Sequence, residues 1–184
     1  MMKTELEPSL QTSQGDDVAG TSVPAGGGKG GGKTVSTGGL LNRMLTLTAR
    51  SLPSYFYRAR PWMPGRFVDL WDAMQEIAGE HREFAAKVAE HLVRRGEMPN
   101  PGNYPAVYTA WHDLSLDFLA DKMIRELRDG AAELEAAIGG PGLDPAVVKT
   151  AESLRGLFLD EAERLQTLWD DLRRASPASP ENAA

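Results

Sequence analysis

The chain has 184 residues, a formal net charge of -6 and no cysteine. The lack of cysteine excludes disulfides, thiol nucleophiles, zinc–thiolate sites and iron–sulfur clusters, and the negative charge argues against nucleic acid or an anionic membrane surface as a partner. The N-terminal residues MMKTELEPSLQTSQ lack the apolar stretch of a secretory signal, and no run of 18 apolar residues is present to span a bilayer. We therefore expect a cytoplasmic protein with room for one domain.

Residues 27–34 read GGKGGGKT and satisfy the phosphate-binding pattern G-x-x-x-x-G-K-[ST]. A phosphate loop needs a buried strand before it and a helix directly after it. The preceding residues contain no run of apolar or β-branched residues, and VSTGG delays any helix. We interpret the segment as a flexible spacer and expect residues 1–38 to form a disordered Gly-rich arm. A spacer binds no nucleotide, so replacing Lys33 by Ala should cause no loss of nucleotide affinity.

From residue 39 to residue 175 apolar residues recur at steps of three and four, the period of amphipathic helices. A first helix is predicted over residues 41–59, where Pro53 marks a kink or a restart because proline lacks the N–H group. A second helix is predicted over residues 67–92, and Gly96 suits its C-terminal cap.

Two more helices are predicted further along the chain. The third covers residues 105–138 and is stopped by the sequence GGPG at 139–142. The fourth opens with Asp144 as N-cap and Pro145 at the first helical position, and its apolar stripe continues to Leu172. The tail, residues 176–184, is expected to be disordered.

Four amphipathic helices without a strand can bury their stripes only against one another, so we predict an all-α fold, a four-helix bundle over residues 39–175. The connection between the second and third helices, residues 97–104, is rich in proline and should be extended. Both a simple meander and a crossover that runs along the bundle are compatible with its length.

The sequences ARSLPSYFYRARPW, EHREFAAKVAEHLVRRGEMP and YPAVYTAWHDLSLDFL resemble, in order, helix A, the end of helix B and the start of helix C of the ferritin-like superfamily. The resemblance implies an antiparallel four-helix bundle made of two hairpins. In its metal-binding members an inward Glu on helices A and C and a Glu-x-x-His pair on helices B and D hold two metal ions, iron or manganese. No Glu-x-x-His occurs in this chain.

The inward polar positions that remain are His81 and Glu161, with further candidates nearby at Thr48, Ser115, His112 and Glu126. An atypical metal site would consist of His81, Glu126 and Glu161. We favour a second interpretation, in which His81 and Glu161 form a hydrogen-bonded buried couple that fixes the register of two helices.

Two classes of function follow. One is a ferritin-like, non-catalytic binding or scaffold module without a complete di-iron site, whose N-terminal arm tethers the bundle or reaches a protein partner. The other is a metal-dependent oxidase or an iron-handling protein that uses iron or manganese. The missing ligands favour the first class, for which no cofactor is expected. Nucleophilic hydrolysis has little support, because no Ser–His–acid set can be assembled from the spacing.

The tryptophans are interpreted as boundary residues with one wet edge, and they would also suit the contact face of a homodimer. The four are Trp62, Trp71, Trp111 and Trp169. Light scattering tests the dimer, since a monomer near 20.0 kDa would contradict it.

Overall fold

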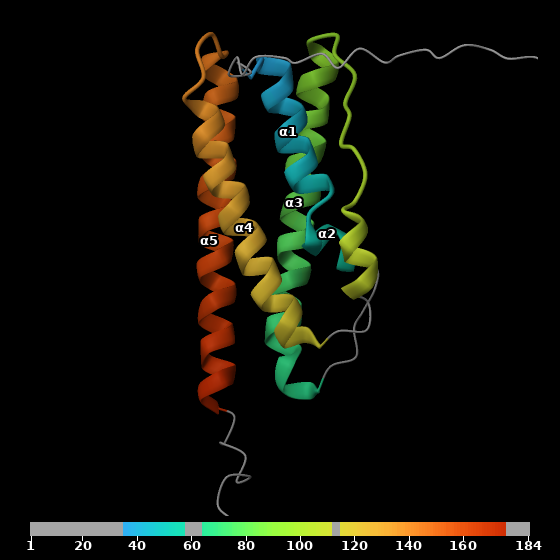
Figure 1. Ribbon diagram of the computed structural model, residues 1–184, viewed down its shortest axis with the longest axis vertical. Coiled ribbons are helices and arrows are strands. Elements are labelled where there is room, and N and C mark those ends of the chain that lie inside the picture. Colours follow the sequence, from blue (N-terminus) through green and yellow to red (C-terminus); the bar gives the residue numbers. More distant parts are fainter. Residues whose placement is uncertain (1–34, 58–63, 112–114, 176–184) are drawn as a thin grey trace, which may run out of the picture. The chain divides into compact units, whose positions relative to one another are not determined.

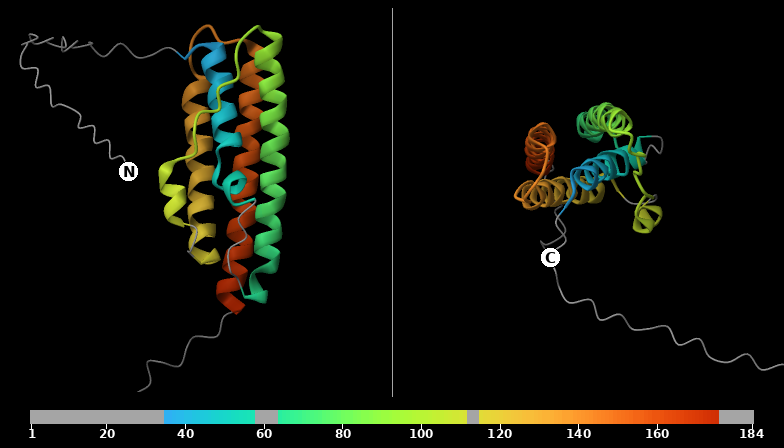
Figure 2. Two further views of the ribbon diagram at one scale, coloured as in Figure 1. Left: turned by 90° about the vertical axis from the view of Figure 1, so that its right-hand side faces the viewer. Right: turned by 90° about the horizontal axis from the view of Figure 1, so that it is seen from above.

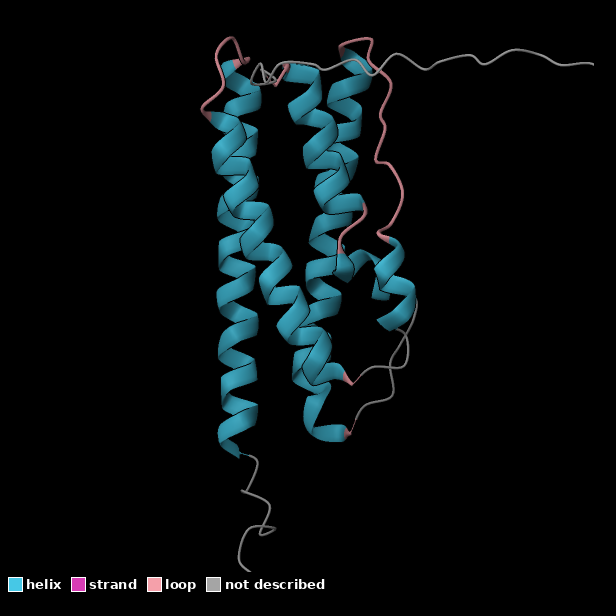
Figure 3. Ribbon diagram, viewed as in Figure 1, coloured by secondary structure: helices cyan, strands magenta, loops and turns pink. Residues whose placement is uncertain are grey.

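The computed structural model describes residues 35–57, 64–111 and 115–175, in which every regular element is a helix (Figure 3). The elements, labelled where there is room in Figure 1, are α1 Thr37–Ala49, α2 Leu52–Phe56, the 3-10 helix η1 Gly65–Phe67, α3 Val68–Arg94, the 3-10 helix η2 Ala106–Trp111, α4 Leu116–Ile138 and α5 Pro145–Ala175. The predicted all-α class is thus confirmed for these ranges. None of the described helices has the length and apolar character needed to cross a membrane.

The arm and the tail predicted from composition fall largely outside these ranges. Residues 1–34, including GGKGGGKT, and residues 176–184 are not among the described residues. Helix α1 starts at Thr37, two residues before the expected boundary, because Ser36 caps it and accepts a hydrogen bond from the Gly39 N–H at 3.0 Å.

Three helix boundaries predicted from the sequence are confirmed. Helix α3 ends in a Schellman motif, in which Gly96 adopts a φ of 74° and the Glu97 N–H bonds to the Leu92 carbonyl at 3.0 Å. Helix α5 starts at Pro145, with the Asp144 carboxylate accepting the Ala146 N–H at 2.9 Å. The first predicted helix does restart near Pro53, as α2.

The third predicted helix is shorter than expected. Residues 106–111 form the separate 3-10 helix η2, and α4 begins only at Leu116. Ser115 occupies the N-cap position of α4 with an extended backbone and an exposed side chain, so its prediction as a candidate near the inward polar positions was wrong. His112 lies outside the described residues.

The helices pair as two hairpins. Helix α1 packs mainly against α3, and α4 packs mainly against α5, while α5 also contacts α1 and α3. Figures 1 and 2 show that α1 and α5 run in one direction and that α3 and α4 run in the other. Residues 95–111 return along the outside of the helices to allow this, so the chain follows the crossover path and not the simple meander.

Polar contacts hold the connection after α3 against α1 and its C-cap residue Arg50. The Asn100 N–H donates to the Asn42 side-chain oxygen at 2.8 Å, and the Arg50 guanidinium donates to the Gly102 carbonyl at 2.8 Å. The Arg50 guanidinium lies over the Tyr104 ring, with its Cζ atom 4.9 Å from the centroid of that ring.

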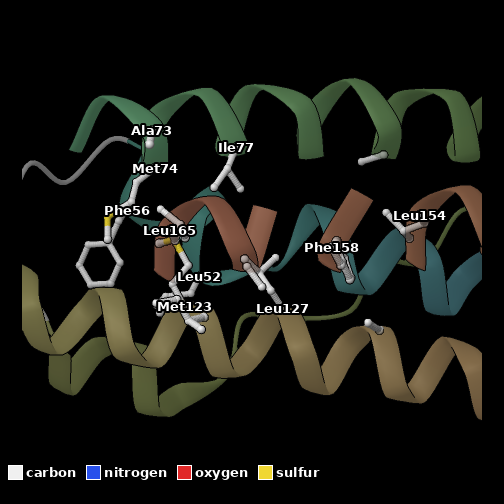
Figure 4. Close-up of a cluster of buried hydrophobic side chains, with 14 of the residues drawn as sticks. Leu52, Phe56, Ala73, Met74, Ile77, Met123, Leu127, Leu154, Phe158 and Leu165 are labelled. Carbon is white, nitrogen blue, oxygen red and sulfur yellow. The ribbon is translucent and has the colours of Figure 1, made fainter. Parts of the chain in front are cut away.

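The apolar stripes meet in one core, which Figure 4 shows in part. Leu127 and Phe158 belong to this core, with 3% and 2% of their surface exposed. Trp71 and Trp169 also belong to this core, each only 8% exposed, so these two are not the wet boundary residues that we expected. They offer no exposed face for a dimer, which itself remains a prediction.

Candidate functional site

The site begins at the break between α1 and α2. Pro53 has no N–H to donate to the Ala49 carbonyl four residues earlier, so the helix cannot continue. The Arg50 guanidinium donates to the Ala49 carbonyl instead, at 3.2 Å. The break also frees the Leu52 N–H, which in a continuous helix would bond to the Thr48 carbonyl. Here it points into the interior and meets a side chain of α4.

The hydroxyl of Ser51 connects this break to the buried histidine. It donates to the Thr48 carbonyl at 3.0 Å and lies 2.8 Å from His81 Nδ1. Because the Ser51 hydroxyl donates its hydrogen bond to that carbonyl, its oxygen is available to accept a hydrogen bond from the Nδ1–H group. The other ring nitrogen of His81, Nε2, lies 2.9 Å from Glu161 Oε2. The predicted couple of His81 and Glu161 is therefore confirmed as a hydrogen bond between α3 and α5.

Both members of the couple are deeply buried, His81 at 0% and Glu161 at 4% exposure. Burial raises the pKa of the Glu161 carboxyl, the hydrogen bond and charge of His81 lower it, and the neighbouring Glu80 carboxyl raises it again. Glu161 Oε1 is buried and has no hydrogen-bond partner among the described residues. The His81 ring also packs 5.1 Å from the ring of Phe158, which fixes its orientation.

Ser51, His81 and Glu161 thus form a hydrogen-bonded Ser–His–acid chain, which the spacing in the sequence had not allowed us to assemble. Acyl transfer would also require backbone N–H groups free to stabilise an oxyanion. The N–H after the serine, that of Leu52, donates to Glu126 at 3.1 Å. The N–H of Ser54 points back to Ser51 itself at 3.4 Å. Both of these N–H groups are therefore already bonded, and the chain of hydrogen bonds positions the imidazole.

A cavity of about 140 Å³ lies beside this chain of hydrogen bonds. Its walls come from α1, the α1–α2 break, α3, α4, α5 and the connection before and within η2. The lining residues are Arg43, Thr46, Leu47, Arg50, Ser51, Pro53, His81, Asn103, Pro105, Tyr108, Glu126, Leu127 and Phe158.

Glu126 joins three segments around the cavity. Its Oε2 accepts the Leu52 N–H at 3.1 Å, and its Oε1 accepts the Tyr108 hydroxyl of η2. Burial raises the pKa of Glu126 from its ordinary 4.5 to about 7; the Leu52 N–H opposes the rise and Asp129 adds to it. The neutral carboxyl keeps both contacts, because its O–H can donate to the Tyr108 oxygen while its carbonyl accepts from Leu52.

The three candidate metal ligands are placed differently from one another. His81 and Glu126 line the cavity, whereas Glu161 lies behind His81 and does not line it. The His81 nitrogens and both Glu126 oxygens already bond to protein groups. Over residues 35–57, 64–111 and 115–175, no three or more His, Asp or Glu side chains group to hold a metal ion. The donor set does not fit the two-metal centre that the resemblance implies.

Thr48, the inward residue of the first helix, is buried as predicted, but its hydroxyl donates to the Met44 carbonyl at 2.8 Å within α1. Ser51, Arg50 and Tyr108 were not predicted from the sequence as site residues. A serine two residues before Pro53 is a recognisable N-cap signal and would have drawn attention to Ser51. No local pattern points to the other two, because their roles depend on the path of the connection.

Comparison of the chain with protein-family models, with curated proteins and with solved structures gave no match.

Proposed function

We propose that the chain is a ferritin-like four-helix bundle that lacks a dinuclear metal centre and works as a cytoplasmic, non-catalytic binding module. Its binding site is the cavity beside His81. The path of the chain supports the ferritin-like arrangement: each hairpin is antiparallel, and the long connection makes α3 and α4 run in the same direction.

The observation that carries the proposal is the state of the polar groups around the cavity. His81 and Glu126 occupy the interior where the resemblance places metal ligands, yet both bond to protein groups. The space beside them is about 140 Å³ and has apolar walls at Leu47, Leu127 and Phe158. Concave, largely apolar spaces with a few fixed polar groups are typical of small-molecule sites.

Benzene is a suitable neutral probe, because a cavity of about 150 Å³ in another protein holds it. We expect benzene to raise the melting temperature of the wild type and to shift the methyl NMR signals of Leu47 and Leu127. Leu47→Phe, which fills the cavity, should abolish both the rise in melting temperature and the shift of the Leu127 methyl signals. Leu159→Phe is the matched control, since Leu159 is 41% exposed and does not line the cavity.

The competing metal-dependent function is tested on untagged protein with Fe²⁺ and Mn²⁺. Binding of either ion to the folded state would raise the melting temperature through linkage. A rise that disappears in the double variant His81→Leu with Glu161→Met would refute the non-catalytic proposal. Failure of benzene and of its acid and alcohol derivatives to bind the cavity would refute it as well.

A further inference from the structure

The charged groups at the cavity differ in how far the protein satisfies them. Arg43 forms an ion pair with Glu133, and Glu126 accepts two hydrogen bonds. Arg50 is the exception, because within the described ranges it pairs with no carboxylate. Arg50 is therefore a cation at the cavity that forms no ion pair within the described ranges.

Arg50 is held in place without its charge being neutralised. Its Nε donates to the Gly102 carbonyl at 2.8 Å, and its Nη1 donates to the Ala49 carbonyl at 3.2 Å. The guanidinium also lies over the ring of Tyr104. Its Nη2 has no acceptor in the part of the chain that the structure describes. A guanidinium fixed in this way loses little conformational entropy when it binds an anion.

Asn103 provides a second free group at the same side of the cavity. It follows Gly102, the residue that anchors Arg50, and it lines the cavity from the connection. Its exposed side-chain amide forms no hydrogen bond with the described residues. An amide N–H₂ and a guanidinium together offer donors of the kind that a carboxylate accepts.

The rest of the space suits a hydrocarbon. Leu47, Leu127 and Phe158 line it. The side chains of Leu127 and Phe158 lie in the space between the helices (Figure 4). Its volume of about 140 Å³ is close to that of the cavity that holds benzene in another protein, about 150 Å³. A fully hydrophilic anion such as inorganic phosphate would leave these walls unfilled, and an amine would be repelled by Arg50.

We propose that the cavity binds a small carboxylic acid of about the size of benzoate, whose carboxylate pairs with Arg50 and Asn103 and whose apolar body lies between Leu47, Leu127 and Phe158. The inference rests on the proposed function, since it names the ligand class of the same cavity. Arg50 and Asn103 are then the residues that determine the preference for an acid.

The test compares benzoate, benzyl alcohol and benzene by calorimetry and NMR titration on the full chain. We expect benzoate to bind the wild type roughly 10-fold or more tightly than benzyl alcohol, because a charge-assisted hydrogen bond replaces a neutral one. Arg50→Met should weaken benzoate by roughly 10- to 100-fold and leave benzene within about 2-fold. Arg128→Met is the control, since Arg128 is exposed on α4 and does not line the cavity.

Arg50 also anchors the connection, so Arg50→Met can disturb folding. Asn103→Ala removes only an exposed amide and should still weaken benzoate by about 3- to 10-fold. Equal affinity of the wild type for benzoate and benzyl alcohol would overturn the inference, as would unchanged benzoate affinity in both variants. Benzene binding with no preference for benzoate would refute this inference alone, whereas no binding of any of the three probes would also refute the proposed function.

Discussion

Replacing either His81 or Glu161 alone is expected to destabilise the fold strongly. His81→Leu leaves the 4%-exposed Glu161 carboxyl with neither oxygen bonded, and Glu161→Met leaves His81 Nε2 without a partner. Removing one member of a buried charged pair costs about 3 to 5 kcal/mol, and an unsatisfied neutral group costs about 1 to 3 kcal/mol. We therefore expect a loss of about 3 kcal/mol in the free energy of unfolding for each single variant.

The double variant His81→Leu with Glu161→Met should lose at least about 2 kcal/mol less than the two single variants lose together, because neither member of the pair is left behind unpaired. Ser51 keeps its bond to the Thr48 carbonyl in all three variants. The loss in His81→Leu should also grow with pH. Without His81 the pKa of Glu161 in the folded state rises further above its pKa in the unfolded state. The free energy of unfolding therefore falls as the pH rises from the unfolded-state pKa towards the folded-state pKa.

Urea unfolding measures these differences, followed by circular dichroism at 222 nm and by the fluorescence of the buried Trp71 and Trp169. Coincidence of the two probes checks that unfolding is two-state. The reasoning would be refuted if the loss in the double variant equalled the sum of the single losses within about 0.5 kcal/mol, the range of independent sites.

Two further substitutions test the packing and the electrostatics. Gly130→Ala should lower the free energy of unfolding by about 1 to 3 kcal/mol, because the new Cβ would lie 2.9 Å from the buried Phe158 ring. Gly79→Ala, which meets nothing within 4 Å in the middle of α3, should raise it by about 1 kcal/mol, and the same sign in both would contradict this packing. The free energy of unfolding of the wild type should fall as the pH rises from 4.5 to about 7. The cause is Glu126, whose pKa in the folded state lies above its pKa in the unfolded state. Glu126→Gln keeps the contact with Tyr108 and should reduce this loss by about 1 to 2 kcal/mol in urea unfolding at pH 5 and pH 8; an unchanged pH profile would show that Glu126 is not responsible.

Much of the candidate site was accessible from periodicity. The apolar stripes of the second and fourth helices placed His81 and Glu161 at inward positions, and their hydrogen bond follows from that placement. Glu126 was recognised only as a candidate near these two residues and as a possible metal ligand. Its role could not be predicted, because one of its partners is a backbone N–H that is 74 residues away and that becomes free only through the break at Pro53.

The sequence by itself determined the all-helical class and most of the helix ends, because these depend on interactions within a few residues. Gly96 can adopt a positive φ, Asp144 can cap the amides that follow it, and Pro53 must break a helix wherever the chain goes.

Only the tertiary structure decided that the connection returns along α1, and with it the composition of the cavity. Arg50 meets Gly102 across 52 residues, Ser51 meets His81 across 30, and Tyr108 reaches Glu126 from the separate helix η2. A proline-rich segment of this length has no periodic pattern that fixes its path, and both connections considered are compatible with its reach. The contacts that select one path join residues far apart in the sequence, so no local pattern reveals them.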